Sequence, residues 1–270
     1  MKKVFLDIGA HTGETLEEVI RPVYGFDRIL CFEPSPQCFP ALEAFAARDS
    51  RIELCRFGLG DGRQELKLYG SGEDFASTLG PDPAGTAASG QAAACDTVWI
   101  EDAAEWARHH LDPGDLIVCK INCEGGEIGI LQSWIKAGLL PLFYSVMITF
   151  DIRNFKALRH QEGALRAELR RLNLANTCFA DDVMIGPTHE QRIARWLGLF
   201  GLDQPNLPSL EAYRAAFAGP LTTYARKRGY RHRAESLLKQ TLGYGALPTP
   251  VRVGLRRLKA AFGLNPERVA

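Results

Sequence analysis

Apolar runs of strand length alternate with amphipathic stretches of helical period over the first 187 residues. This alternation is typical of a parallel sheet whose strands are joined by crossover helices. The predicted strands are 3–8, 28–33, 52–59, 115–122 and 142–150, with a final pair near 175–186. The predicted helices are 12–21, 36–48, 99–110, 126–138 and 158–172. Thr12 is the expected N-cap of the first helix and Gly138 the expected C-terminal stop of the fourth.

Residues 70–95 interrupt this alternation, because they are rich in Gly, Ala, Ser and Pro and show no clear period. A loop of this length inside a compact domain is usually a lid or a disordered segment. It joins the third strand region to the helix before the fourth, so we expect it on the ligand side of the sheet. Its hydroxyl residues Ser77 and Thr78 are candidates to donate hydrogen bonds to a cofactor or an acceptor when the loop closes.

The pattern changes after Pro187 to helices separated by Pro and Gly, and the charge changes with it. Residues 1–187 carry 18 Lys and Arg against 27 Asp and Glu, whereas residues 188–270 carry 14 against 5. The chain is therefore predicted to consist of a domain at 1–187 and a basic helical C-terminal extension at 188–270.

The last predicted helix of this extension is amphipathic and cationic. Its apolar face carries Val251, Leu255, Leu258 and Phe262, and Arg252, Arg256, Arg257 and Lys259 lie off that face. One interpretation is an interfacial helix that docks on anionic lipid or a partner. The other is self-association or packing on its own domain, with solvated charges. Nucleic-acid binding is not expected, because the sequence has no zinc-ligand spacing and no RNA-binding motif.

The composition is that of an ordinary globular protein of 270 residues, with no net charge. Seven scattered cysteines, none spaced as C-x-x-C, predict reduced and mostly buried thiols and neither a disulfide framework nor a zinc site. No charged and apolar signal precedes the first strand, and no apolar run is long enough to span a bilayer. We therefore expect a cytoplasmic protein.

The first predicted strand runs into a glycine-bearing turn that suggests a nucleoside site. Asp7, Gly9 and Gly13 follow this strand, and Glu33 ends the second one. In open α/β sheets, ligands bind beyond the carboxyl ends of the strands at the topological switch point. Glycine in this turn avoids a side chain that would displace the ligand or strain the backbone. The next helix offers free N–H groups to the ligand. Glu33 can accept hydrogen bonds from both ribose hydroxyls.

Two cofactors suit such a site. A dinucleotide fingerprint requires G-x-G-x-x-G, but His11 stands where the second glycine belongs and Glu14 where the third does. The pattern D-x-G-x-x-x-G with an acidic end to the second strand instead resembles a class I S-adenosylmethionine site. The sequence favours S-adenosylmethionine, and NAD stays an alternative.

Further along, the segment LIVCKINCEGGEIGIL at 116–131 resembles the K-I-D-V-E-G-x-E signature of the FkbM-family methyltransferases. FLDIGAHTG, CFEPSPQCFPALE, FGLGDGRQELKLY, ASTL and CDTVWIED resemble other segments of that family in the same order. The resemblance covers roughly residues 4–187 and not the extension.

The resemblance implies a Rossmann-like class I methyltransferase with a doubly wound, mostly parallel seven-stranded sheet. It implies an S-adenosylmethionine-dependent O-methyltransferase that acts on a sugar, polysaccharide or secondary metabolite. The implied cofactor-binding residues lie in the first loop, at the second and third strand ends, in the insert and after the fourth strand: Asp7, Gly9, Ala10, Gly13, Glu33, Pro34, Gly60, Asp61, Ser77 and Asn122.

Asn122 departs from the family pattern, because it replaces the aspartate that follows Lys-Ile. Metal-dependent O-methyltransferases place a magnesium-binding carboxylate at this strand end, and a neutral amide is a poor anchor for that ion. We therefore expect methyl transfer without a metal ion.

The candidates for acid–base chemistry are His11, Glu124, Glu127, Asp151 and Lys120. His11 has a suitable ordinary pKa, although it also fits a packing role beside the first helix. Glu124 and Glu127 enter a helix three residues apart, where the helix dipole also favours acidic residues. Lys120 alternates into an apolar strand, where it needs a paired carboxylate, and Glu124 is the expected partner.

The sequence thus predicts a cytoplasmic, metal-independent O-methyltransferase with S-adenosylmethionine as cofactor and a small molecule or glycan as substrate. Two alternatives stay open. One is an NAD-dependent oxidoreductase on the same sheet, and the other is a nucleoside-binding scaffold without catalysis.

Overall fold

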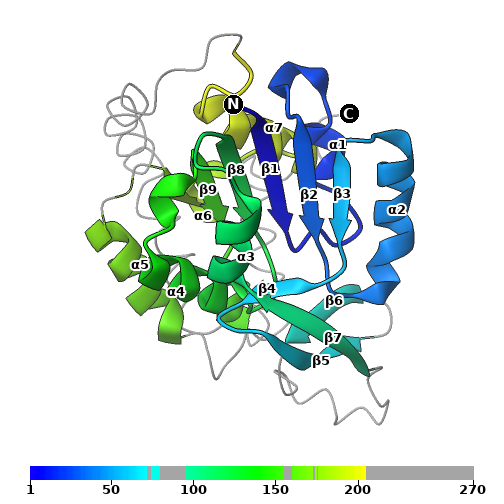
Figure 1. The fold of residues 1–270 in the computed structure, drawn as a ribbon, viewed down its shortest axis with the longest axis vertical. Helices are drawn as coiled ribbons and strands as arrows, with labels where there is room; N and C mark the ends of the chain where they lie inside the picture. The colour runs from blue at the N-terminus through cyan, green and yellow to red at the C-terminus, as the bar shows by residue number, and fades with distance from the viewer. Residues whose placement is uncertain (72–73, 80–94, 155–159, 173, 175, 205–270) are drawn as a thin grey trace, which may run out of the picture.

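The computed structural model describes residues 1–71, 74–79, 95–154, 160–172, 174 and 176–204. Its main sheet has six parallel strands in the order β10-β9-β8-β1-β2-β3 (Figure 1). The strands are β1 (Lys3–Ile8), β2 (Arg28–Phe32), β3 (Ile52–Cys55), β8 (Leu116–Ile121), β9 (Ser145–Ile148) and β10 (Thr177–Phe179). The order reverses between β1 and β8, as in Rossmann-like folds.

Helices cover both faces of this sheet. Buried residues of α1 (Leu16–Val19), α2 (Phe39–Arg48) and α7 (His189–Leu199) pack on one face. Those of α3 (Ala103–His110), α4 (Glu127–Ala137) and α5 (His160–Leu172) pack on the other. The shorter helices are η1 (Pro22–Tyr24), η2 (Pro36–Cys38), η4 (Leu140–Leu142), η5 (Asp151–Asn154) and α6 (Ala180–Val183). The expected doubly wound α/β fold is therefore confirmed.

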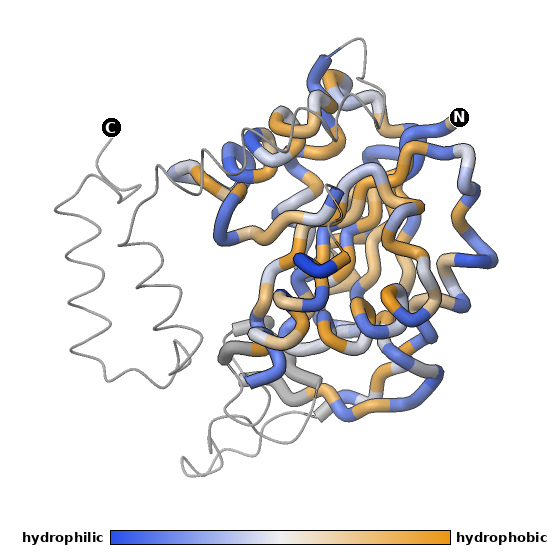
Figure 2. Tube along the Cα trace, turned by 90° about the vertical axis from the view of Figure 1, so that its left-hand side faces the viewer, coloured by the Kyte–Doolittle hydropathy of each residue, from blue (hydrophilic) through white to orange (hydrophobic). Residues whose placement is uncertain are grey.

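The alternation along β1 shows how the strands divide their side chains between the two faces. Val4, Leu6 and Ile8 belong to the core under α3, α4 and α5, whereas Phe5 belongs to the core under α1, α2 and α7. Because side chains alternate along a strand, Asp7 lies on the same face as Phe5. Figure 2 shows the apolar strands in the interior of the molecule. A charged residue of β1 is thus placed under the α1 and α7 face.

A second sheet lies beyond the carboxyl ends of β1, β2 and β3 (Figure 1). Its order is β4-β7-β5-β6, formed by β4 (Gly58–Gly60), β5 (Gln64–Ser71), β6 (Asp74–Leu79) and β7 (Cys95–Asp102). The strand expected at 52–59 is thus two strands in different sheets. Gly58 fits close to β7, because a Cβ there would lie 2.6 Å from Cδ1 of Ile100.

Part of the segment 70–95 is regular, contrary to the expectation of an irregular loop. Residues 74–79 form β6, which pairs antiparallel with β5, so Ser77 lies opposite Gly70 and Thr78 opposite Tyr69. The small residues of this segment have a low strand propensity, so composition did not indicate the strand. Backbone pairing with β5 forms it instead. Residues 80–94 lie outside the described part of the chain.

Two predicted helices begin later in the structure than the sequence suggested. The helix expected at 12–21 is only α1 (Leu16–Val19), because the backbone at His11 and Gly13 has positive φ and the N-cap is Thr15, not Thr12. The helix expected at 99–110 begins at Ala103, where the Asp102 side chain caps α3 by accepting from the Glu105 N–H at 2.7 Å. Gly138 does end α4 in the left-handed region, as expected.

The expected final pair of strands is a single strand followed by a helix. After β10 (Thr177–Phe179) the chain forms α6 (Ala180–Val183), whose first turn contains Asp181 and Asp182. Acidic residues disfavour a strand and stabilise a helix N-terminus. Within the described residues the main sheet therefore has six strands and not seven.

Helix α7 (His189–Leu199) begins just after the predicted boundary at residue 187 and packs in the core under the main sheet. Ile193, Trp196, Leu197, Phe200 and Leu202 are all fully buried. The indole N–H of Trp196 donates to the Ser145 hydroxyl at 3.1 Å, and Tyr144 donates to the Phe200 carbonyl at 3.0 Å. Residues 189–202 thus share a core with β9, while residues 205–270, which include the predicted amphipathic helix, lie outside the described residues.

Two further expectations concern cysteines and membranes. The six cysteines whose side chains the structure describes are free, and Cys31, Cys38, Cys119 and Cys178 are buried. Among the described residues, no helix combines the length and the apolar character that crossing a membrane requires.

We expect Trp196→Ala to lower the free energy of unfolding by about 3–5 kcal/mol, because it leaves a large cavity beneath the sheet. Chemical denaturation of the full chain measures this loss. Gln191→Ala, an exposed position on the same helix, is the control and should change stability by less than about 0.5 kcal/mol. Equal stability of the two variants would show that α7 does not belong to the core.

Candidate functional site

The loops after β1 and β8 meet at the point where the strand order reverses. The Asn122 N–H donates to the Ile8 carbonyl at 2.9 Å. Gly9 has a φ of +77°, and a Cβ there would lie 1.8 Å from the Asn122 carbonyl oxygen. Gly13 has a φ of +94°, and its Cβ would lie 2.7 Å from the Phe45 ring. Both glycines are therefore required by the protein's own packing, whereas the sequence suggested close approach of a ligand.

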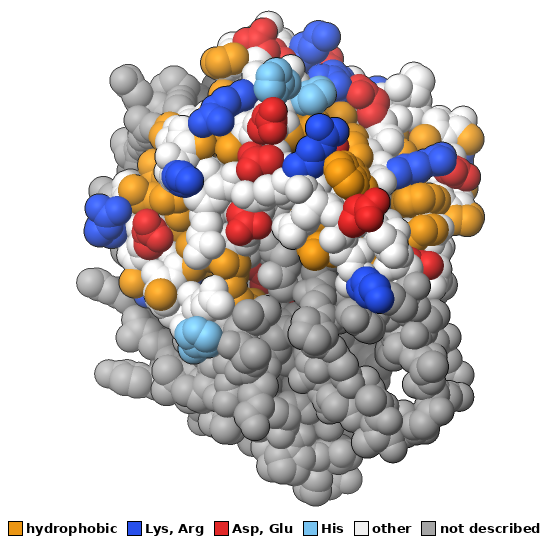
Figure 3. All heavy atoms as spheres, turned by 60° about the horizontal axis from the view of Figure 1, so that its bottom comes forward, with side chains coloured by type: hydrophobic (Ala, Val, Ile, Leu, Met, Phe, Trp, Pro, Cys, Tyr) orange, Lys and Arg blue, Asp and Glu red, His pale blue; other side chains and the backbone are white. Residues whose placement is uncertain are grey.

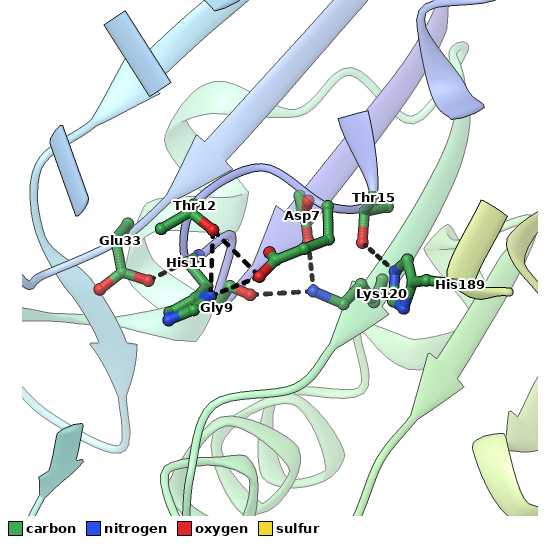
Figure 4. A network of polar contacts seen from close by, with 9 residues as sticks. Asp7, Gly9, His11, Thr12, Thr15, Glu33, Lys120 and His189 are labelled. Carbon is green, nitrogen blue, oxygen red and sulfur yellow. Dashed lines mark hydrogen bonds and ion pairs between the residues drawn. The ribbon is translucent and has the colours of Figure 1, made fainter. Parts of the chain in front are cut away.

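Lys120 pairs with Asp7 and not with Glu124, which corrects the expectation from the sequence. Asp7 and Lys120 are directly opposite each other in the parallel register of β1 and β8. Lys120 Nζ donates to Asp7 Oδ1 at 2.7 Å and to the Gly9 carbonyl at 2.9 Å (Figure 4). Spacing along the chain did not show this register, which places the two side chains on one face.

The Asp7–Lys120 ion pair is buried, with Asp7 fully inaccessible and Lys120 4% exposed. Burial raises the pKa of Asp7, and the attraction of Lys120 opposes that rise. Asp7 Oδ2 has no hydrogen-bond partner among the described residues. Because Lys120 also holds the Gly9 carbonyl, this ion pair ties the first loop to the sheet, so Lys120 is fixed and is not a mobile acid or base.

The first loop bends back on itself through His11 and Glu14. His11 Nδ1 lies 2.7 Å from Glu14 Oε1, and the Thr12 hydroxyl donates to the same oxygen at 3.0 Å. The hydrogen bond to Glu14 raises the pKa of His11. For Glu14, burial would raise the pKa, but the contacts with His11 prevail and lower it to about 2. His11 is thus held as a partner of Glu14, which makes it a poor general base.

Glu33 follows β2 and faces this loop, with 7% of its surface exposed. Its Oε1 accepts from the Ser35 N–H at 2.8 Å and its Oε2 from the His11 N–H at 2.9 Å. Burial raises the pKa of Glu33, and these two N–H donors oppose the rise. Each carboxylate oxygen keeps a further acceptor position, so the side chain is oriented and still able to bind two hydroxyls.

A second group of carboxyl side chains follows β8 and β9. Burial, with Asp151 nearby, raises the pKa of Glu124 to about 7 and that of Glu127 to about 8. Glu127 is fully buried and accepts from the Ile152 N–H at 2.6 Å and the Gly125 N–H at 2.8 Å. Glu127 therefore holds the two loops together, while Glu124 is partly exposed.

The backbone at two of these loop residues is in an uncommon conformation. His11 has a φ of 52° and Glu124 a φ of 45°, and both are non-glycine residues. Such conformations are uncommon outside glycine and gather at functional sites. The positive charge of His11 acts to lower the pKa of Glu124, but burial, which raises that pKa, prevails. These two residues lie in the loops after β1 and β8, which the hydrogen bond from the Asn122 N–H to the Ile8 carbonyl joins.

The other predicted site residues lie around these two groups. Ala10 is buried in the first loop, and a Cβ on Gly58 would lie 3.6 Å from Pro34, which brings the start of β4 next to the Glu33 loop. Gly60 ends β4, and the exposed Asp61 lies beside the first turn of α4 at Gly129. Asn122 Oδ1 is a buried oxygen with no partner among the described residues.

Charged and apolar side chains are mixed on the end of the molecule that carries the second sheet. Figure 3 shows acidic, basic and histidine side chains together on the described part of this face.

Among the described residues, no group of three His, Cys, Asp or Glu side chains is placed to hold a metal ion.

Thr15 and His189 lie at the site although neither residue belongs to a motif in the sequence. Thr15 Oγ1 lies 3.1 Å from His189 Nε2, beside the Asp7–Lys120 ion pair (Figure 4). The Thr188 side chain caps α7 by accepting a hydrogen bond from the Gln191 N–H at 3.3 Å. A Thr before an amphipathic stretch is a typical helix N-cap, so the sequence indicated the start of this helix. It did not show which part of the sheet the helix covers.

Comparisons with known proteins identify a family. The family model of the methyltransferase FkbM domain matches residues 7–173. A crystal structure of methyltransferase FkbM from Methylobacillus flagellatus KT aligns at 20% sequence identity and a TM-score of 0.34, over 50% of this chain and 30% of that chain. No curated protein matches significantly. The family match ends before β10, α6 and α7.

We expect Lys120→Met to lower the free energy of unfolding by about 3–5 kcal/mol, because it leaves the Asp7 carboxylate buried without its partner. Chemical denaturation checks this. The double variant with Asp7→Asn should recover most of the loss, since no unpaired charge then remains. A double variant as unstable as Lys120→Met alone would contradict this account of the pair.

Proposed function

We propose that this chain, which belongs to the FkbM methyltransferase family, transfers the methyl group of S-adenosylmethionine to a hydroxyl of a sugar, glycan or secondary metabolite, without a metal ion. Glu33 is the observation that carries the assignment of a nucleoside cofactor, because a carboxylate at this strand end can accept from ribose hydroxyls. It ends β2 with both oxygens oriented by backbone N–H groups and an acceptor position left on each. A cytoplasmic location is part of the same proposal.

The first loop supports S-adenosylmethionine over NAD on electrostatic grounds. Dinucleotide proteins bind pyrophosphate at the helix N-terminus that follows this loop. Here Glu14 stands just before α1, and its contacts with His11 keep its pKa at about 2 although burial opposes them. An ionised carboxylate at this place repels the two negative charges of a pyrophosphate, whereas S-adenosylmethionine brings one carboxylate together with a positively charged sulfonium.

The residues that would hold the cofactor follow from this arrangement. Glu33 would hold the ribose hydroxyls, and the backbone of the loop at Gly9, Ala10 and Gly13 would lie around the methionyl part. The orphaned buried oxygens Asp7 Oδ2 and Asn122 Oδ1 lie at the same strand ends, as expected of a site that gains polar partners. When bound, S-adenosylmethionine supplies an electrophilic methyl group and a neutral sulfide leaving group.

Glu124 is the residue that we propose as general base. Burial and the nearby Asp151 raise its pKa to about 7, which suits proton abstraction at neutral pH. Its carboxylate would take the proton of the acceptor hydroxyl, with Asp151 tuning its basicity. His11 and Lys120 are each held by a counter-charge at 2.7 Å and serve to position the loop.

We expect titration calorimetry to show that the full chain binds S-adenosylmethionine and not NAD. Glu33→Ala should weaken binding about 10- to 100-fold, because it removes hydrogen bonds from a carboxylate. Glu17→Ala, at an exposed position of α1, is the control with unchanged affinity. Preferential binding of NAD would overturn the choice of cofactor.

The methyl transfer itself is tested with sugar or glycan acceptors. The expected results are the release of S-adenosylhomocysteine and a product that is heavier by one methylene.

We expect Glu124→Gln to lower kcat by about 10²- to 10⁴-fold, the usual contribution of a general base. The wild-type kcat should rise with pH through about 7, because only the deprotonated carboxylate accepts a proton. The variant should lose that dependence and bind the cofactor as before. Glu105→Gln, exposed on α3, is the control. An unchanged pH profile in Glu124→Gln would assign the base elsewhere.

A further inference from the structure

His189 opens α7, outside the part of the chain that matches the family. Its Nε2 nevertheless lies 3.1 Å from the hydroxyl of Thr15, eight residues after Asp7. The contact bridges 174 positions of sequence. A helix that follows the family domain therefore reaches the first loop of the site.

The position of His189 is fixed by the packing of its helix. Trp196 and Phe200 are fully buried, and the Trp196 indole is hydrogen-bonded to Ser145 of β9. At the other end, Arg192 Nε donates to the Gly186 carbonyl at 2.9 Å. Because α7 is anchored in the core, the His189 side chain is preorganised. It therefore fixes the position of the Thr15 hydroxyl and does not move with it.

Thr15 is the residue of the site that His189 contacts. It is 2% exposed and is the N-cap of α1, yet its side chain makes no capping hydrogen bond within the helix. Its hydroxyl faces His189 instead. Helix α1 has only four residues, and so short a helix has little stability of its own. Contacts from outside must therefore fix its place.

The charges around His189 suit a neutral imidazole in this role. Burial and the positive charge of Lys120 lower its pKa, while Asp7, Glu14 and Glu190 act in the opposite direction. The ring also stands at a helix N-terminus, where a positive charge is disfavoured. A neutral ring can share a hydrogen bond with the Thr15 hydroxyl beside the Asp7–Lys120 pair (Figure 4).

We propose that His189 is a positioning residue for cofactor binding: through the Thr15 hydroxyl it holds α1 and the loop at Gly9–Gly13 in the arrangement that receives S-adenosylmethionine. The inference rests on the proposed function. On this proposal α7 contributes a residue to cofactor binding in addition to packing in the core. In this arrangement Lys120 holds the loop from the sheet, and His189 holds it from α7 through Thr15.

The test measures the affinity of the full chain for S-adenosylmethionine by calorimetry. His189→Leu should weaken binding about 3- to 10-fold, which corresponds to one hydrogen bond. His189→Gln should bind as the wild type does, because its amide end reaches the place of Nε2. His189→Asn, whose amide corresponds to Nδ1, should lose as much as His189→Leu. Gln191→Ala, at an exposed position of the same helix, is the control.

Thr15→Val gives the second arm of the experiment. It should weaken binding as much as His189→Leu, and the double variant should be no weaker than either one, since both remove the same contact. Thermal unfolding of each variant identifies any that has lost its fold. The Gln and Asn variants differ by one methylene, so their comparison remains decisive if His189→Leu does not fold.

The possible outcomes separate the two proposals. A wild-type chain that does not bind S-adenosylmethionine overturns the proposed function and this inference with it. A wild-type chain that binds, together with undiminished binding by His189→Leu, overturns the inference alone. Equal affinities of the Gln and Asn variants, or additive losses in the double variant, would also exclude the Thr15 contact as the route.

Discussion

The buried ion pair of Asp7 and Lys120 is the interaction on which the site depends. Two charges removed from water are tolerated only with good geometry and further hydrogen bonds. The parallel register of β1 and β8 places the side chains opposite each other, and the Gly9 carbonyl gives Lys120 its second acceptor. A displaced loop would therefore remove an acceptor from a buried ammonium. The sheet and the first loop are coupled in this way.

The same loop is connected to its other neighbours by main-chain groups. The N–H groups of Gly9 and Ala10 both donate to the Phe32 carbonyl, at 3.0 and 3.1 Å, and that of His11 donates to Glu33. On the other side, Asn122 donates to Ile8. Because no side chain fits at Gly9, the loops after β1 and β8 approach closely. The orientation of Glu33 thus follows from the path of the backbone.

The sequence predicted most of this arrangement, because burial leaves a clear pattern along the strands. The runs at 3–8, 28–33 and 115–122 are β1, β2 and β8 within one residue at their ends, and the acidic residue after β2 does face the first loop. The partner of Lys120 was wrong, since register between strands is not encoded in spacing along the chain. The second sheet was missed because its edge strand β6 (Asp74–Leu79) lies in a stretch of small residues.

The charge shift at residue 187 shows why composition and packing need not divide a chain at the same point. Net charge is determined by exposed side chains such as Arg195, whereas the core is determined by the opposite face of the helix. In α7 that face carries Ile193, Trp196 and Leu197, which are fully buried under the sheet. A basic helix can therefore belong to an acidic domain. Once its apolar face is buried, the first residue of α7 lies next to Thr15, and a region outside the family match becomes a neighbour of the site.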